Sequence, residues 1–267
     1  MTSNQPRVIA VDMDGTFLRS DFSYDRPRFA RVRERMRDAG VRFVVASGNQ
    51  DAQLRSFFDD PDEFAYVSDN GAWVRAEGDG EVLFTARIAP DVVKNVAAVL
   101  DAERAPYCAC GPGMAWVPRH TGEEFARFIA LYYHRLSVVD DVRDFGDRVF
   151  KFTLADDRGL PPHLASAVTE AVGAGVTPVT SGHGSLDLNA PGVHKGAGLQ
   201  ILLDRWGVPA SQVAAFGDSG NDLEMLRLVG HPVAMANGLP AVREVAGTVV
   251  ADHDADGVLD QLEAWFG

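Results

Sequence analysis

Short apolar runs alternate with amphipathic helical patterns at both ends of this chain. Residues 7–12 (RVIAVD) predict a strand, 25–38 a helix that ends before Gly40, and 41–46 (VRFVVA) a second strand, with a further helix to about Phe58. Strands that alternate with helices are typical of a parallel sheet with helical crossovers. This end of the chain therefore predicts an α/β fold, in which ligands bind beyond the carboxyl ends of the strands.

The same alternation returns near the C-terminus. Residues 195–206 are predicted to be helical, followed by strands at 213–216, 232–235 and 248–251 and a closing helix to Phe266. Polar side chains that directly follow these strands should lie at the same sheet edge as those of the first half. We expect the functional site at that edge.

Between these two parts, the pattern is mixed. Its expected elements are helices at 91–103, 123–133 and 164–172 and strands at 115–117, 149–154 and 176–179. This is typical of an α+β insertion rather than of more parallel sheet. We predict a discontinuous core domain, residues 1–86 and 188–267, that carries an inserted second domain, residues 87–187.

The charge of the chain excludes some classes of partner. Its 38 acidic and 25 basic residues give a net charge of -13, with 46% hydrophobic residues. Such a surface repels nucleic acid, and any small anionic substrate would need a locally positive site. No apolar run reaches the ~18 residues of a membrane helix, and the polar N-terminal residues are unlike a signal peptide. We expect a cytoplasmic protein without a membrane partner and make no prediction of its oligomeric state.

Cys108 and Cys110 are separated by a single residue. Cysteines this close rarely form a disulfide, and no further Cys or His stands nearby at zinc-ligand spacing. We expect two reduced cysteines that serve packing.

Two loops that follow predicted strands are rich in aspartate. Asp12 and Asp14 belong to the stretch DMDGT, and Asp218 and Asp222 to the stretch GDSGND. An acidic turn would explain one Asp and the Gly of the first loop, but not a second loop of the same character. Carboxylates gathered at one sheet edge repel one another unless a cation lies among them, and Mg²⁺ prefers such oxygen ligands. We predict a Mg²⁺ site formed by these four residues.

A phosphoryl group needs hydrogen-bond donors and positive charge around its oxygens. Ser47 and the backbone of Gly48 follow the second predicted strand, and Lys195 opens a predicted helix. Each signal is weak alone, because a Ser before a Gly is usually a turn and a single Lys is usually a solvated charge. Their places at a strand end and a helix start favour phosphate binding.

These four motifs, in this order, resemble those of the haloacid dehalogenase superfamily: DxDG[TS], a Ser or Thr, a later Lys, and GDxxND. The insertion resembles the larger, C2-type cap of the Cof-type subfamily, and 68–72 (SDNGA) resembles the loop before that cap. Further stretches, such as FVVASGNQ and PVTSGHGSLDL, are similar to the sugar phosphatases of this subfamily. The resemblance covers essentially the whole chain and implies a doubly wound, Rossmann-like parallel core with an inserted α+β cap.

The resemblance also implies an activity. The chain would be a Mg²⁺-dependent phosphatase that hydrolyses small phosphate monoesters, above all sugar phosphates, through an aspartyl-phosphate. Asp12 would be the nucleophile and Asp14 the acid and base. Asp12, Asp218 and the backbone carbonyl of Asp14 would hold the metal, with Asp222 as a further ligand or an orienting residue.

By the same resemblance, Ser47, Gly48, Lys195 and Asn221 would hold the phosphoryl group, and Asn70 would contact the substrate. Further candidates lie in the insertion: the Cys108–Met114 loop, residues 132–135 (YYHR), Lys151 and residues 181–187. Each of these residues would equally fit an ordinary packing or surface role. Many Cof-type members have an Arg directly after the Ser/Thr-Gly, where this chain has Asn49.

Three other functions would also use strand–loop–helix units or the same motifs. A dinucleotide-binding domain would need G-x-G-x-x-G after the first strand, and the chain has Asp12 and Asp14 there instead. A sugar-phosphate phosphotransferase or phosphomutase would use the same residues, and only its products would differ. A non-catalytic binding protein on this fold would be expected to lack Asp12 or Lys195, and both are present.

Overall fold

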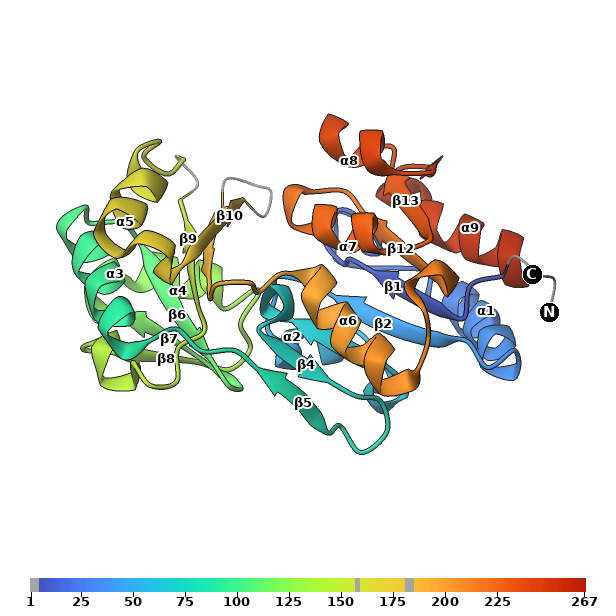
Figure 1. Cartoon of the computed structure of the whole chain (residues 1–267), viewed down its shortest axis with the longest axis horizontal. Helices are drawn as coiled ribbons and strands as arrows, with labels where there is room; N and C mark the ends of the chain where they lie inside the picture. Colours follow the sequence, from blue (N-terminus) through green and yellow to red (C-terminus); the bar gives the residue numbers. More distant parts are fainter. Residues whose placement is uncertain (1–4, 157–158, 181–184) are drawn as a thin grey trace.

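Two lobes, each built on its own β-sheet, lie side by side in the computed structural model (Figure 1). It describes residues 5–156, 159–180 and 185–267. One lobe is formed by both ends of the chain and the other by its middle. No helix among the described residues is long and apolar enough to cross a membrane.

The larger lobe, called the core here, holds an eight-stranded sheet in the order β14-β13-β12-β1-β2-β3-β4-β5. Its strands are β1 (Val8–Val11), β2 (Arg42–Ala46), β3 (Ala65–Ser68), β4 (Trp73–Arg75), β5 (Val82–Thr85), β12 (Val213–Gly217), β13 (His231–Met235) and β14 (Thr248–Val250). The pairs from β14 to β3 are parallel, whereas β4 and β5 are antiparallel to their neighbours. β1 is flanked by β12 on one side and β2 on the other, so the carboxyl ends of all three strands meet at one edge.

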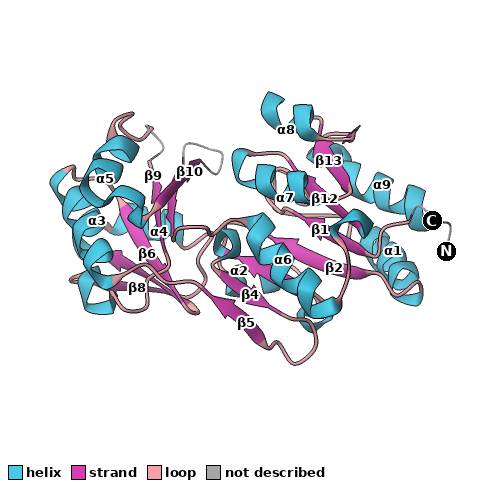
Figure 2. Cartoon of the chain, in the orientation of Figure 1, coloured by secondary structure: helices cyan, strands magenta, loops and turns pink. Residues whose placement is uncertain are grey.

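Helices cover both faces of this sheet (Figure 2). The core helices are α1 (Arg26–Asp38), α2 (Asp51–Arg55), α6 (Lys195–Trp206), α7 (Leu223–Leu228), α8 (Pro240–Val245) and α9 (Gly257–Phe266). Side chains alternate along β1 because successive residues of a strand point to opposite faces. Ile9 and Val11 pack with residues of α1 and α9, and Val8 and Ala10 pack with residues of α6, α7 and α8. This is the doubly wound α/β arrangement predicted from the sequence.

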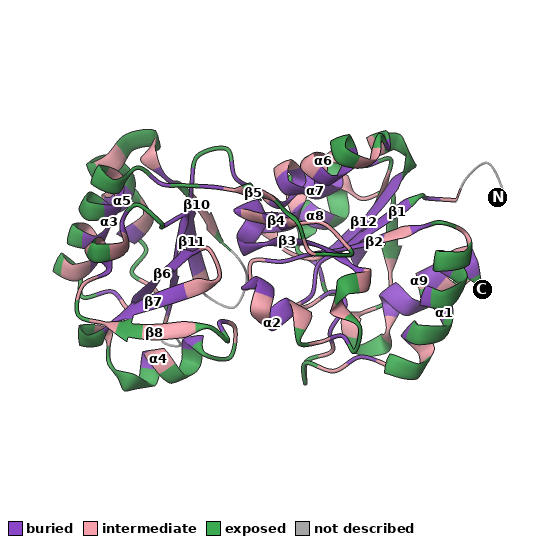
Figure 3. Cartoon of the chain, turned by 90° about the horizontal axis from the view of Figure 1, so that it is seen from below, coloured by how far each residue is buried: buried purple, intermediate pink, exposed green. Residues whose placement is uncertain are grey.

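The smaller lobe, called the cap here, holds a six-stranded sheet in the order β10-β11-β9-β6-β7-β8. Its elements are α3 (Pro90–Ala102), β6 (Tyr107–Gly111), β7 (Met114–Pro118), α4 (Glu123–Ile129), β8 (Leu136–Val139), β9 (Lys151–Ala155), α5 (Leu164–Val172), β10 (Thr177–Thr180) and β11 (Ser185–Asn189). Among the cap strands that the structure describes, only β7 and β8 pair in parallel. The central strands are buried, and the outer faces of the helices are exposed (Figure 3). This is the expected α+β insertion.

Several local predictions differ from the structure. The helix predicted at 123–133 ends at Ile129, and the Cys108–Met114 loop is mostly the hairpin of β6 and β7. β11 continues to Asn189, beyond the predicted end of the insertion at 187, because its residues pair with β9 up to that point. We therefore propose that the cap extends to Asn189. Both connections to the core run beside the two residues that precede β9: Ile88 N donates to Val149 O, and Ala190 N donates to Phe150 O.

Two of the three lysines of the chain are fully buried. Lys151 opens β9 and Lys195 opens α6, whereas Lys94 lies exposed on α3. Lysine is almost never fully buried without a charged partner, so both buried lysines point to polar sites inside the molecule.

Candidate active site

Asp12 directly follows β1, the central strand of the core sheet. Its backbone N donates to Phe216 O of β12, 3.0 Å away, which fixes it at the sheet edge, and only 4% of the residue is exposed. The chain then turns sharply, with Gly15 at φ +76°. A Cβ at Gly15 would lie 2.8 Å from Oδ2 of Asp218, so the glycine lets the two acidic loops approach closely.

Lys195 joins the two acidic loops because its ammonium group contacts one carboxylate of each. Its Nζ donates to Oδ1 of Asp12 at 2.5 Å and to Oδ1 of Asp222 at 2.7 Å, and the side chain is fully buried. Burial opposes the charge on Lys195, but the carboxylates of Asp12 and Asp222 outweigh burial and raise the pKa of Lys195 above its usual value. Lys195 therefore stays charged and places a fixed positive charge between the carboxylates of Asp12 and Asp222.

Asp222 is held by both of its carboxylate oxygens. Oδ1 accepts from Lys195, while Oδ2 accepts from the backbone N–H groups of Asp218 and Ser219, each at 3.0 Å. The carboxylate thus shapes the loop that carries Asp218. Gly217 allows this, because a Cβ there would lie 2.5 Å from Cβ of Asp222.

Asp12, Asp218 and Asp222 form a cluster that could hold a metal ion, with one oxygen of each within 4.8 Å of the others. Burial raises the pKa of Asp12 well above its ordinary value, against the opposing charge of Lys195. Burial and the charge of Asp222 raise the pKa of Asp218 to about 6. A divalent cation beside these oxygens would favour their ionised forms, and three hard oxygen donors suit Mg²⁺. The residues present therefore fit the predicted ion.

Asp14 occupies a different position from the other three aspartates. Its carboxylate is not part of that cluster, and its Oδ2 accepts from Nδ2 of Asn49 at 2.7 Å. Sequence reasoning noticed Asn49 only as a departure from the usual Arg, and missed this contact. The signal was its place directly after Ser47-Gly48, at the sheet edge that also carries Asp14.

The loop of Ser47 is fixed by backbone contacts. Ser47 N donates to Val67 O at 2.9 Å, and Asn70 N donates to Ser47 O at 2.9 Å. Asn49 N donates to Oγ of Ser47 at 3.1 Å, so this hydroxyl can direct its own hydrogen to a bound anion.

Two buried polar contacts join this loop region to the cap. Nζ of Lys151 donates to Gly48 O at 2.5 Å and pairs with Oδ1 of Asp69 at 2.9 Å. Nδ2 of Asn70 donates to Oδ2 of Asp187 at 2.7 Å. Burial raises the pKa of Asp69 to about 6, although the charge of Lys151 opposes that shift.

Asn70 was predicted to contact substrate, and its side chain is largely engaged inside the protein. Its Nδ2 bonds to Asp187, and its Oδ1 accepts from Nδ2 of Asn221 at 3.1 Å. The residue also has a left-handed backbone, φ 58°, which asparagine tolerates. In this arrangement Asn70 orients Asn221.

A cavity of about 450 Å³ lies between the two lobes. Of the predicted site residues, its wall includes Asp12, Asp14, Ser47, Gly48, Asp218 and Asn221. Lys195, Asp222 and Asn70 are buried behind this wall. On the cap side the wall includes Phe128, Ile129, Tyr132, Tyr133, Thr153, Ser185 and Asp187. The structure therefore brings the four motifs together at a cavity whose facing wall belongs to the cap.

Of the remaining cap candidates, some line the cavity and others lie elsewhere in the structure. Cys108 and Cys110 are buried, unbridged thiols in β6, as expected, with their sulfur atoms 3.8 Å apart. Tyr132 and Tyr133 line the cavity, whereas Arg135 contacts the core through its backbone, which exchanges two hydrogen bonds with Gln50. Residues 181–184 lie outside the described residues.

The chain is similar to known proteins over nearly its whole length. A family model described as haloacid dehalogenase-like hydrolase matches residues 9–262. The chain is 40% identical to 5-amino-6-(5-phospho-D-ribitylamino)uracil phosphatase YbjI of Escherichia coli, over 96% of this chain and 95% of that protein. It is 25% identical to the phosphatase of the same name, YitU, of Bacillus subtilis, over 98% of each.

Solved structures show the same fold. SMU.1108c of Streptococcus mutans has a TM-score of 0.90 at 30% identity, covering 98% of this chain and 99% of that one. The subclass IIB sugar phosphatase BT4131 has a TM-score of 0.83 at 20% identity, over 97% of this chain and 98% of that one, which supports the fold alone.

Proposed function

We propose that Asp12 is the nucleophile of a Mg²⁺-dependent reaction that proceeds through an aspartyl-phosphate. The chain belongs to the haloacid dehalogenase-like hydrolases and is a phosphoric monoester hydrolase of that type. The observation that carries this proposal is the carboxylate of Asp12 itself. It lines the cavity, is paired with Lys195 at 2.5 Å, and lies in one cluster with Asp218 and Asp222. A buried carboxylate held this way is oriented before substrate arrives.

In the first step, an oxygen of Asp12 forms a bond to phosphorus while the bond from phosphorus to the leaving oxygen breaks. Asp14 donates a proton to that leaving oxygen. In the second step Asp14 takes a proton from the water that hydrolyses the acyl phosphate, which releases inorganic phosphate and restores Asp12. The hydrogen bond from Asn49 to Oδ2 of Asp14 fixes the orientation of this carboxyl group.

The oxygens of the phosphoryl group would be held by the Ser47 hydroxyl, the backbone N–H of Gly48 and the side chain of Asn221. Lys195 adds charge from behind Asp12. Asp12, Asp218 and the backbone carbonyl of Asp14 would hold Mg²⁺, which stabilises negative charge on the phosphoryl oxygens when bound. We assign Asp222 chiefly to positioning, since its Oδ2 accepts from two backbone N–H groups of the loop that carries Asp218 and its Oδ1 accepts from Lys195.

We further propose that the leaving group is a sugar or sugar alcohol. The cavity of about 450 Å³ is within the usual range for small-molecule sites and has room beyond a phosphate group. Two relatives that align with nearly the whole chain are named for a phosphoribityl substrate, in which the phosphate is esterified to a sugar alcohol. That compound is the first substrate to test.

The test measures phosphate release from sugar phosphates, nucleotides and 5-amino-6-(5-phospho-D-ribitylamino)uracil, with Mg²⁺ and with chelator. Wild type should release phosphate only with Mg²⁺, and Asp12→Asn should release none while it keeps the circular dichroism of wild type. Asp38→Asn is the matched control, because Asp38 is exposed at the end of α1. Near-normal release by Asp12→Asn would overturn the nucleophile, and transfer to a second sugar without free phosphate would overturn hydrolysis.

A further inference from the structure

Three aromatic side chains form one wall at the mouth of the cavity: Phe22 of the core and Phe128 and Tyr132 of the cap. The ring of Tyr132 lies edge-to-face between the other two, with centroid distances of 6.3 Å to Phe22 and 5.7 Å to Phe128. Phe22 is 46% exposed and Phe128 is 42% exposed. Large apolar side chains that are exposed together at a cavity often mark a binding site.

The backbone of Phe22 supports this interpretation. Phe22 has φ 60°, a left-handed conformation that is uncommon for a bulky residue and strains the backbone. Burial of the ring does not offset this strain, because nearly half of the residue is exposed. Strained backbone at the edge of an active site is frequently tied to function.

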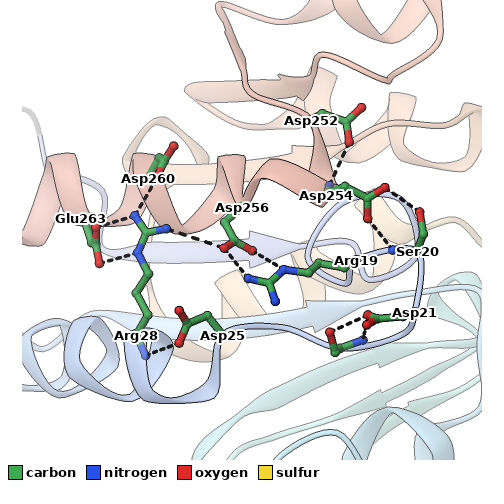
Figure 4. A network of polar contacts seen from close by, with 11 residues as sticks. Arg19, Ser20, Asp21, Asp25, Arg28, Asp252, Asp254, Asp256, Asp260 and Glu263 are labelled. Atoms are coloured by element: carbon green, nitrogen blue, oxygen red, sulfur yellow. Dashed lines mark hydrogen bonds and ion pairs between the residues drawn. The ribbon is translucent and has the colours of Figure 1, made fainter.

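The loop that carries Phe22 is anchored through its neighbours Arg19 and Ser20 to the segment before α9 (Figure 4). The guanidinium of Arg19 donates twice to the carboxylate of Asp256, at 2.9 and 2.5 Å. Ser20 donates through its backbone N and its Oγ to the carboxylate of Asp254, each at 2.8 Å. These contacts anchor the loop against the segment before α9 and hold the Phe22 ring at the cavity mouth.

The chemistry of the wall selects among leaving groups. Phe22 and Phe128 carry no polar side-chain atom, so they cannot satisfy the hydroxyl groups of a sugar. Their faces suit a planar π system, because aromatic rings prefer to stack or to meet edge to face. Polar wall residues such as Asp14, Asn49 and Thr153 can serve a hydroxylated chain between the phosphate and such a ring.

We propose that Phe22, Phe128 and Tyr132 form a subsite for a planar heteroaromatic ring carried by the leaving group. The subsite rests on the proposed function, because the phosphate of the same substrate must lie at Asp12. The subsite contains specificity-determining residues of both lobes, so the ring is bound only when core and cap are in contact.

Two probes that differ only in the ring test this subsite: riboflavin 5′-phosphate and ribitol 5-phosphate. We would measure kcat/KM for both with wild type, Phe22→Ala and Phe128→Ala. Stacking of a base on an aromatic side chain is worth about 1–3 kcal/mol by alanine substitution, so each variant should lose at least about fivefold on riboflavin 5′-phosphate. On ribitol 5-phosphate the loss should stay below about twofold. Leu131→Ala is the matched control, because Leu131 is 58% exposed beside Tyr132 and is absent from the cavity wall.

Binding separates this proposal from the catalytic one. The dissociation constant of riboflavin 5′-phosphate, measured by flavin fluorescence in the Asp12→Asn background, should rise at least about fivefold on adding Phe22→Ala or Phe128→Ala. Such a rise, with no phosphate released by wild type from any compound of the panel above, would overturn the proposed reaction at Asp12 and leave the subsite standing. Equal losses on both probes, or flavin binding that neither substitution changes, would overturn the subsite.

Discussion

Replacing Lys151 by Met should lower the free energy of unfolding at neutral pH and lower it much less at acidic pH. Nζ of Lys151 pairs with Oδ1 of Asp69 at 2.9 Å, and both side chains are essentially inaccessible to water. Removing one partner of a buried ion pair typically costs about 3–5 kcal/mol, because the other charge is left uncompensated. Asp187 still receives hydrogen bonds from Thr153 and Asn70, so Asp69 is the carboxylate that loses its cation.

The sign of the pH dependence follows from Asp69. Its pKa is about 6 in the folded wild type against about 3.9 in an unfolded chain, so the folded state binds the proton more tightly. Stability from this group is full below the unfolded value and is lost as pH rises through the folded one. Lys151 opposes the upward shift, so its removal raises the folded pKa further and extends the loss to higher pH. The difference between variant and wild type should therefore be small near pH 5 and largest near pH 8.

Urea unfolding at both pH values measures this effect. Asp69→Asn added to Lys151→Met should recover at least about 2 kcal/mol near pH 8, since no orphan charge remains. Lys94→Met serves as the control, because Lys94 is exposed. A Lys151→Met protein as stable as wild type near pH 8, or a double variant no better than the single one, would refute the reasoning.

Two further predictions concern the reacting groups. Asp14→Asn should slow release of phosphate from sugar phosphates far more than from aryl phosphates, because aryl leaving groups need no proton. Steady-state rates on both classes of substrate measure this difference. Equal losses on both classes would contradict the acid role. Gly15→Ala should raise the Mg²⁺ concentration needed for half-maximal activity, because the added Cβ would lie 2.8 Å from Oδ2 of Asp218. The control is Gly78→Ala, which has a similar φ of +83° but lies in open space and should leave that concentration unchanged.

The parts of this molecule that local pattern controls could be predicted from the sequence. The parallel core follows from alternating strands and helices, and Asp12 and Asp218 could be placed together because they follow parallel strands. β7 was predicted at 115–117, but β6 was not, because the Cys108–Met114 stretch was expected to be a loop. β6 contains Ala109 and Gly111, and both residue types are depleted in strands.

Contacts between the lobes could not be predicted. Lys151 and Gly48 are 103 residues apart, and Asn70 and Asp187 are 117 apart. Periodicity reports which face of an element is buried, but not which distant loop it is buried against. The left-handed backbone of Phe22 also has no sequence signal, because the residue is neither Gly nor Asn.

The distribution of lysines has a practical consequence for labelling. An amine-reactive reagent needs an accessible, unprotonated ε-amino group, and Lys151 and Lys195 are buried with their pKa raised by neighbouring carboxylates. Among the lysine side chains, this leaves Lys94, on the outer helix α3 of the cap. A fluorophore or surface linker attached through lysine would thus sit at one defined point of the cap, away from the catalytic groups.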